Sequence, residues 1–443
     1  MGVGRIAVHE LRLAQPQEVG VDVCLGHRAG TLTAVTQLFD PGFMEDPWPR
    51  YAELREASPV HLDPRGFWVV TRHDDCLEIL RSKASSADGA NIDPDSLPDG
   101  FGRQRGRGDM PDELAQAMDD NRPFLFRDPP EHTRMRGLVS KAFTPRMVDG
   151  LRPRIEAMVD ELLDSAFERG DIDVVRDFAY PLPIQVICEM LGIPEGDRDR
   201  FSEWSAVLAR GLDPEFLQPE GAVEERFSVI GAFSEYFFGL MAERRRAPGD
   251  DLLSQLALAE EAGDVLTEGQ MFSTAILLLV AGHETTVNLI SGGVLALVNH
   301  PDQLARWRDD PSITPRAVEE LLRFVSPVQL TGRALLDDIE LSAGTLPKGH
   351  YVLSVIASGN RDPEAFTDPE SLDVARAENR HLGFGFGLHH CLGAPLARLE
   401  TAIALPRLLE RTRSIELLSD RATYRDNIVL RGLAELAVRL SAA

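Results

Sequence analysis

The stretch that most constrains the fold is one long helical pattern in the second half of the chain. It opens with Thr267-Glu268-Gly269-Gln270, in which Thr followed three residues later by Gln forms a capping box. It ends at His300-Pro301. About 32 residues at 1.5 Å each give a helix roughly 48 Å long. A helix of that length must cross the whole molecule, so the other segments are expected to pack around it.

The centre of this helix joins an apolar run to a polar cluster. The residues from Leu277 to Val280 cover every face of the helix and lead into Ala281-Gly282-His283-Glu284-Thr285-Thr286. Glycine inside a helix costs about 1 kcal/mol relative to alanine, and a buried charge is costly as well. The cluster is either a polar stripe on a core helix or a functional site, and the helix alone leaves both interpretations open.

A second informative stretch is the loop Phe384-Gly385-Phe386-Gly387-Leu388-His389-His390-Cys391-Leu392-Gly393. Its three glycines allow sharp bends and close approach of the backbone to a bulky group. A helical pattern from Ala394 to about Thr412 follows, so Cys391 lies just before a helix N-terminus. The helix dipole and the loop N–H groups there favour a thiolate, and a single axial thiolate suits haem iron. The alternative is a glycine-rich turn that holds a buried free cysteine.

Composition argues against several classes of partner and compartment. The chain has 443 residues and a net charge of -25, which argues against nucleic acid and anionic membranes as partners. Its four cysteines are far apart, so they indicate neither a zinc site nor a disulfide framework and fit a reducing cytoplasm. No signal peptide is evident. The strongest apolar run, 275–281, is too short to span a bilayer, so we expect a soluble protein without a membrane anchor.

The periodicity predicts one mainly α domain with a smaller β region. Residues 1–35 show no period and are predicted to be an N-terminal extension, followed by a single domain over 36–443. Helices are predicted over 49–57, 74–81, 129–142, 146–169, 183–191, 195–212 and 220–246, and strands over 60–62, 67–70, 351–356 and 434–440. Residues 82–127 are rich in Gly, Pro and Asp and predict a long functional or mobile loop.

The spacing F-G-x-G-x-H-x-C-L-G around Cys391 closely resembles the haem-binding loop of the cytochrome P450 superfamily, in the form typical of soluble bacterial members. Further stretches match the family's motifs in order, at 128–136, 281–286, 320–323 and 371–376. The resemblance covers about residue 40 to the C-terminus. It implies the single-domain cytochrome P450 fold, with haem b between the long central helix and the Cys391 loop with its following helix.

The resemblance also implies a role for individual residues. Cys391 is the implied iron ligand, and Glu284 and Thr285 are the implied acid and alcohol of oxygen activation. The implied haem contacts are His132, Arg136, Ala281, Arg333, Phe384, Gly385, Gly387, His389 and Gly393. The implied structural ion network consists of Glu320, Arg323 and Arg376, and the implied substrate contacts are Leu277, Val280, Val328 and Leu330. Without the resemblance, the His132–Arg136 and Glu320–Arg323 pairs would be ordinary solvated pairs on helix faces.

The implied activity is that of a haem-thiolate monooxygenase. Such an enzyme activates O₂ with two electrons and hydroxylates or epoxidises a hydrophobic small molecule, for example in secondary metabolism. By family analogy the electrons come from a ferredoxin and an NAD(P)H-dependent ferredoxin reductase. Three alternatives stay open: a peroxygenase, an oxidase that couples aromatic groups, and a haem sensor without turnover. The Glu284-Thr285 pair argues against the first and the third.

Overall fold

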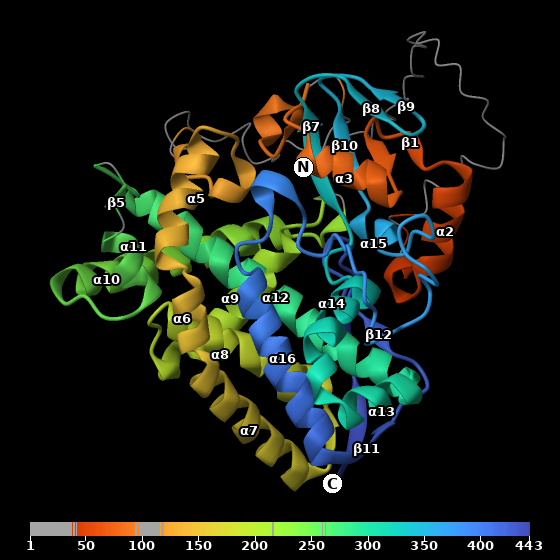
Figure 1. Ribbon diagram of the computed structural model, residues 1–443. Coiled ribbons are helices and arrows are strands. Elements are labelled where there is room, and N and C mark those ends of the chain that lie inside the picture. The colour runs from red at the N-terminus through yellow and green to blue at the C-terminus, as the bar shows by residue number, and fades with distance from the viewer. Residues whose placement is uncertain are drawn as a thin grey trace, which may run out of the picture.

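The long helix α12 spans Glu268–Asn299 and passes through the middle of the molecule (Figure 1). Its start is the predicted capping box, in which the side chains of Thr267 and Gln270 each accept a hydrogen bond from the other's backbone N–H. By length and composition α12 is the one helix among the described residues that could cross a membrane, but 67% of its apolar window is buried inside the protein. It therefore serves as the core helix of the fold.

The computed structural model describes residues 42–93, 119–214, 217–258, 260–261 and 263–443, together with residues 38, 40, 96 and 116. The predicted extension over 1–35 and much of the predicted loop over 82–127 lie outside these residues.

Helices on all sides of α12 form the main apolar core. Those that pack directly against it include α8 (Pro181–Met190), α9 (Arg198–Arg210), α14 (Thr314–Val325) and α16 (Ala394–Arg411). The other helices are α2 (Trp48–Ala57), α3 (His73–Arg81), α5 (Glu131–Ala142), α6 (Pro145–Gly150), α7 (Arg152–Arg169), α10 (Ala222–Arg246), α11 (Leu252–Leu258), α13 (Pro301–Asp309) and α15 (Ile356–Gly359).

The β region is small, and its main sheet lies at the end of the molecule opposite to strand β11, Thr412–Leu417 (Figure 1). Its main sheet has the order β1-β2-β10-β7-β3, formed by Val60–Leu62, Trp68–Val70, Tyr351–Ser354, Thr331–Leu335 and Ser85–Ser86. A second sheet pairs β11 (Thr412–Leu417), β14 (Ala437–Ala442) and β4 (Asp171–Asp173). Two-stranded pairs are β5 (Glu260–Glu261) with β6 (Asp264–Val265), β8 (Ile339–Leu341) with β9 (Gly344–Leu346), and β12 (Thr423–Tyr424) with β13 (Leu433–Glu435). The predicted mainly α architecture with a smaller β region is confirmed.

Candidate active site

The Cys391 loop is folded back on itself directly before α16. Gly385 and Gly387 have φ of +67° and +69°, a conformation that other residues rarely adopt. At Gly387 a Cβ atom would also lie 2.9 Å from the carbonyl oxygen of Leu80. The Cys391 N–H donates to the carbonyl of Phe384 at 2.9 Å, which closes the loop. The glycines therefore hold the cysteine in a fixed position at the helix start.

Cys391 differs from the other described cysteines, because its side chain is exposed whereas Cys76 and Cys188 are buried. Many protein atoms nevertheless surround the sulfur, and this desolvation raises the pKa of the Cys391 thiol. The N–H groups of Gly393 and Ala394 act in the opposite direction, together with nearby arginines. The prediction of a favoured thiolate considered only this second group of effects. In the metal-free chain desolvation outweighs them, and a cationic ligand at the sulfur would restore the thiolate.

Four basic side chains gather beside this loop from three parts of the chain. His132 and Arg136 come from α5, Arg333 from β7, and His389 from the loop itself. The rings of His132 and His389 lie 4.3 Å apart between centroids. Arg136 donates to the carbonyl of His390 at 2.5 Å, and Arg333 donates to the carbonyl of Gly332 at 2.7 Å.

Among the described residues, these basic groups lack a direct ion-pair partner, although the charge of Asp128 acts on His132 and Arg333 from a distance. No described carboxylate forms a salt bridge with Arg136 or Arg333. Both ring nitrogens of His132 and Nδ1 of His389 are buried without a hydrogen-bond partner. Burial and then the surrounding cations lower the pKa of His389 to about 3. Uncompensated donors of this kind fit a ligand that carries two carboxylates, such as the propionates of haem.

The centre of α12 presents an accessible strip within an otherwise buried helix. Ala281 is exposed and Leu277 and Thr285, one turn away on either side, are half-buried. The Thr285 hydroxyl donates to the carbonyl of Ala281 at 2.7 Å, which leaves the lone pairs of its oxygen free to accept a hydrogen bond. The small side chain of Ala281 leaves space on this face for a bound molecule.

Glu284 is buried beside this strip and forms an ion pair with Arg425. Its exposed fraction is 3%, and its Oε2 accepts from Nη1 of Arg425 at 2.5 Å. Its Oε1 has no partner in the structure. Arg425 lies 141 residues further along the chain and is itself partly exposed. No local sequence pattern indicated this ion pair.

Comparison with known proteins decides the family. The cytochrome P450 family model matches residues 232–421. The chain is 44% identical to cytochrome P450 CYP107DY1 of Priestia megaterium over 379 residues, covering 84% of this chain and 89% of the relative.

The chain belongs to the cytochrome P450 family.

Two further relatives support this assignment over almost the whole length. The 6-deoxyerythronolide B hydroxylase of Saccharopolyspora erythraea is 38% identical and covers 92% of this P450 and 100% of its own chain. The solved structure of Mycobacterium smegmatis CYP164A2 with econazole bound is 41% identical and superposes with a TM-score of 0.82, covering 92% and 100%. Members of the family carry haem with a cysteine thiolate as axial ligand and act as monooxygenases. The exposed cysteine, the unpaired cations and the open strip on α12 fit that cofactor.

The predicted substrate contacts of the P450 are only partly brought together. Val280 and Val328 meet in a small apolar cluster, whereas Leu277 packs against the main core. Leu330 belongs to a second cluster near the N-terminal segment, and Val429 packs against both that cluster and the one around Val280. The Val280 cluster contains residues that the sequence did not indicate: Leu208 and Ala209 of α9, and Val429 and Leu430 near the C-terminus.

The predicted ion network of the P450 is assembled around a fully buried Glu320–Arg323 pair. Glu320 and Arg323 both have exposed fractions of 0% and are joined by two hydrogen bonds of 2.7 and 2.9 Å. Arg376 donates to the same carboxylate at 2.9 Å, and Asn379 donates to it at 3.1 Å. Arg323 also donates to three backbone carbonyls, so the network ties α14 to the segment 360–376.

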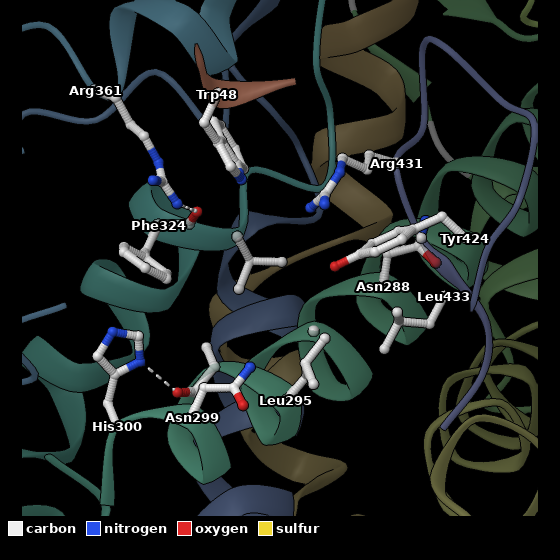
Figure 2. A pocket seen from close by; sticks show the side chains of 14 residues that line it. Trp48, Asn288, Leu295, Asn299, His300, Phe324, Arg361, Tyr424, Arg431 and Leu433 are labelled. Atoms are coloured by element: carbon white, nitrogen blue, oxygen red, sulfur yellow. Dashed lines mark hydrogen bonds between the residues drawn. The ribbon is translucent and has the colours of Figure 1, made fainter. Parts of the chain in front are cut away.

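A separate cavity of about 240 Å³ borders the C-terminal half of α12 (Figure 2). Aromatic rings and guanidinium groups alternate along its wall. Arg361 lies 3.7 Å from the ring of Trp48 and 4.2 Å from that of Phe324, and Arg431 lies 3.9 Å from the ring of Tyr424. None of the predicted haem or substrate residues lines this cavity. We therefore interpret the cation–π contacts of its wall as structural contacts that hold the segment around Trp48 against the core.

Proposed function

We propose that this P450 hydroxylates or epoxidises a hydrophobic small molecule, with Cys391 as the iron ligand. The observation that carries the proposal is the joint placement of an exposed cysteine before α16 and unpaired basic residues beside it. Haem bound there supplies the activation of O₂, because an axial thiolate favours O–O cleavage. His132, Arg136, Arg333 and His389 would hold its propionates, and Phe384, Gly385, Gly387 and Gly393 would shape the proximal loop.

On the side opposite Cys391, residues of α12 would leave space for a bound molecule and take part in proton transfer. Ala281 leaves room, while the Thr285 oxygen can accept a hydrogen bond from a water molecule and hold it in place. Glu284 would supply protons to that water from the partly exposed side of Arg425. Val280 and Val328 provide an apolar wall, together with Leu277 on the accessible strip, and this composition favours an apolar substrate. Relatives named as polyketide-modifying enzymes support a role in secondary metabolism.

A ferredoxin with an NAD(P)H-dependent reductase is the electron source that we propose. Ferredoxins are generally acidic and this chain carries a net charge of -25, so docking requires a local basic surface. Arg380 and Lys141 are exposed near the segments around Cys391. Arg134 and Arg398 are occupied by Glu131 and Glu319, respectively. A cytoplasmic location, where such carriers operate, fits the spaced cysteines.

Replacing Cys391 by serine tests the central assignment. We expect the wild-type protein to show the thiolate-specific Soret band in its reduced CO complex, and C391S to lose it because serine does not provide a thiolate ligand. Cys188→Ala is the matched control, since this cysteine is buried away from the loop, and its spectrum should equal that of the wild type. An unchanged thiolate band in C391S would refute the assignment and with it the proposed site.

Replacing Thr285 by alanine tests the proposed proton relay. T285A should retain haem and substrate affinity, because the lost hydroxyl bonds only within its own helix. NADH consumption should continue, whereas product formed per NADH should fall by on the order of tenfold or more and H₂O₂ formed per NADH should rise correspondingly, because loss of positioned proton transfer typically costs about 10²–10⁴-fold in rate. Thr286→Ala is the control, because its hydroxyl makes the equivalent bond to Gly282 from a buried position. An unchanged product-to-NADH ratio in T285A would reduce Thr285 to a helix-bending role.

A further inference from the structure

A buried carboxylate joins the end of helix α9 to a loop near the C-terminus. Asp213 follows α9 by three residues and has an exposed fraction of 6%. Its Oδ1 accepts from the Val429 N–H at 2.9 Å and its Oδ2 accepts from the Ile428 N–H at 3.3 Å. Two consecutive backbone donors thus meet the two oxygens of one side chain, across more than 200 residues of sequence.

The same loop is fixed on its other side by the segment that follows α14. Gln329 donates its N–H to the carbonyl of Val429 at 2.9 Å, and Arg431 donates to the carbonyl of Pro327 at 2.9 Å. Val328 and Leu430 form an isolated antiparallel bridge between these two bonds. The loop therefore has one edge that pairs through its backbone with residues 327–329. On its other edge, the N–H groups of Ile428 and Val429 bond to Asp213 at the end of α9.

The position of Asp213 matters because the residues on both sides of its two hydrogen bonds form the apolar wall described above. Leu208 and Ala209 stand on α9, Val280 on α12, and Leu430 on the loop. Apolar contacts are not directional, so they do not fix the distance between α9 and the loop. The hydrogen bonds between the Asp213 carboxylate and the two amides do fix this distance, because they require a defined geometry.

The chemistry of the side chain fits this function. A buried carboxylate is disfavoured unless it accepts hydrogen bonds, and burial raises the pKa of Asp213 to about 6 although the two N–H groups lower it. An asparagine of the same shape offers one acceptor oxygen and directs an NH₂ group at the second donor. Only an acidic side chain of this length satisfies both amides at once.

We propose that Asp213 is a positioning residue that latches α9 to loop 428–431 and thereby controls how large ligands enter the substrate chamber. The substrate chamber is the space bounded by this apolar wall, so the inference rests on the proposed function. Opening the latch would separate the Leu208 and Leu430 sides of the wall without altering the Cys391 loop. Large ligands would then enter and leave faster, whereas small ones would not be affected.

Amide exchange in the haem-loaded protein tests the latch directly. In Asp213→Ala, the Ile428 and Val429 N–H groups should both exchange about tenfold faster or more, as expected for loss of hydrogen bonds to a charged acceptor. In Asp213→Asn, at least the amide that faces the new NH₂ group should do so. NMR with ¹⁵N-labelled Ile, Val and Arg resolves these sites. The Arg431 N–H, bonded to Pro327 on the other edge, should keep its rate. Equal acceleration at Arg431 and in α12, or none at Val429 in Asp213→Ala, would overturn the proposal.

Ligand kinetics supply the second readout, with econazole as a large iron-binding probe and imidazole as a small one. Association and dissociation of econazole should both accelerate in D213N and in Asp213→Ala, while imidazole rates stay unchanged. Asp302→Asn, an exposed aspartate on α13, is the matched control and should behave as wild type. If econazole rates do not change, or if both probes change equally, Asp213 does not control entry. The reduced CO spectrum is recorded for every variant, so a failure of the haem assignment is recognised separately from a failure of the latch.

Discussion

Glu320→Ala is expected to destabilise the folded protein by about 3–5 kcal/mol and to leave little haem-loaded enzyme, because it strands buried positive charge. Arg323 would keep its exposed fraction of 0% without its ion-pair partner, and Arg376 would lose the same carboxylate. Chemical unfolding at neutral pH, followed by haem absorbance and by circular dichroism, measures both effects.

An exposed pair of the same spacing supplies the control for this substitution. Arg50 and Glu53 are also three residues apart on a helix, but both side chains are well exposed. Glu53→Ala should therefore change stability by only about 0–1 kcal/mol. If Glu320→Ala gave the same yield, haem content and unfolding midpoint as Glu53→Ala, the network would not contribute to stability as its burial implies.

Glu400→Gln is expected to stabilise the protein, and the gain should grow with pH. Glu400 lies within α16 with an exposed fraction of 1%, and its Oε2 has no hydrogen-bond partner. Burial raises the pKa of Glu400 to about 8. Between its unfolded pKa of about 4.3 and this value, the unfolded chain releases a proton that the folded protein retains. Folding stability therefore falls by about 1.4 kcal/mol per pH unit across that window.

The substitution removes this dependence, because glutamine does not ionise. At pH 4 the variant and the wild type should have nearly equal stability, and at pH 7 the variant should be more stable by on the order of 4 kcal/mol. Guanidinium unfolding at several pH values between 4 and 9 gives the comparison. Glu410→Gln, an exposed position on the same helix, should follow the wild type throughout. A constant difference between E400Q and wild type over this range would contradict the buried ionisation.

Local signals were sufficient for most of the helices and for the motif residues. The capping box at Thr267 set the start of α12 at the predicted residue, since both partners lie within four residues. The Glu320–Arg323 pair was recognisable as a buried network only through the family resemblance, because its spacing alone is that of an ordinary solvated pair on one helix face. The predicted helix over 146–169 is divided into α6 and α7 around Leu151. Pro153 near the start of α7 explains the new beginning, because proline favours the first helical turn.

Contacts between distant segments could not be predicted from one sequence. Neither the Glu284–Arg425 pair nor the Asp213–Val429 bond has a periodic or motif signature, because each joins residues that only the folded chain brings together. Leu330 was assigned to the substrate wall from its place after the Glu320 helix. Its side chain packs in the apolar cluster around Leu38 and Tyr51, beside the cluster of Val280 and Val328, and its role as a substrate contact stays a prediction.

The loop from Arg425 to Gly432 touches the enzyme at two functionally different places. Its base holds Glu284 through Arg425, and its tip is held by Asp213. Gly432 packs so tightly on α12 that a Cβ atom there would lie 1.9 Å from the Asn288 side chain. Engineering or natural drift that reshapes this loop to accept a new substrate will therefore also shift Glu284, the acid to which we assign the proton supply. In directed evolution of this enzyme, variants of this loop that accept new substrates should consume more NADH without forming product. This loss should persist until further changes restore the position of Arg425.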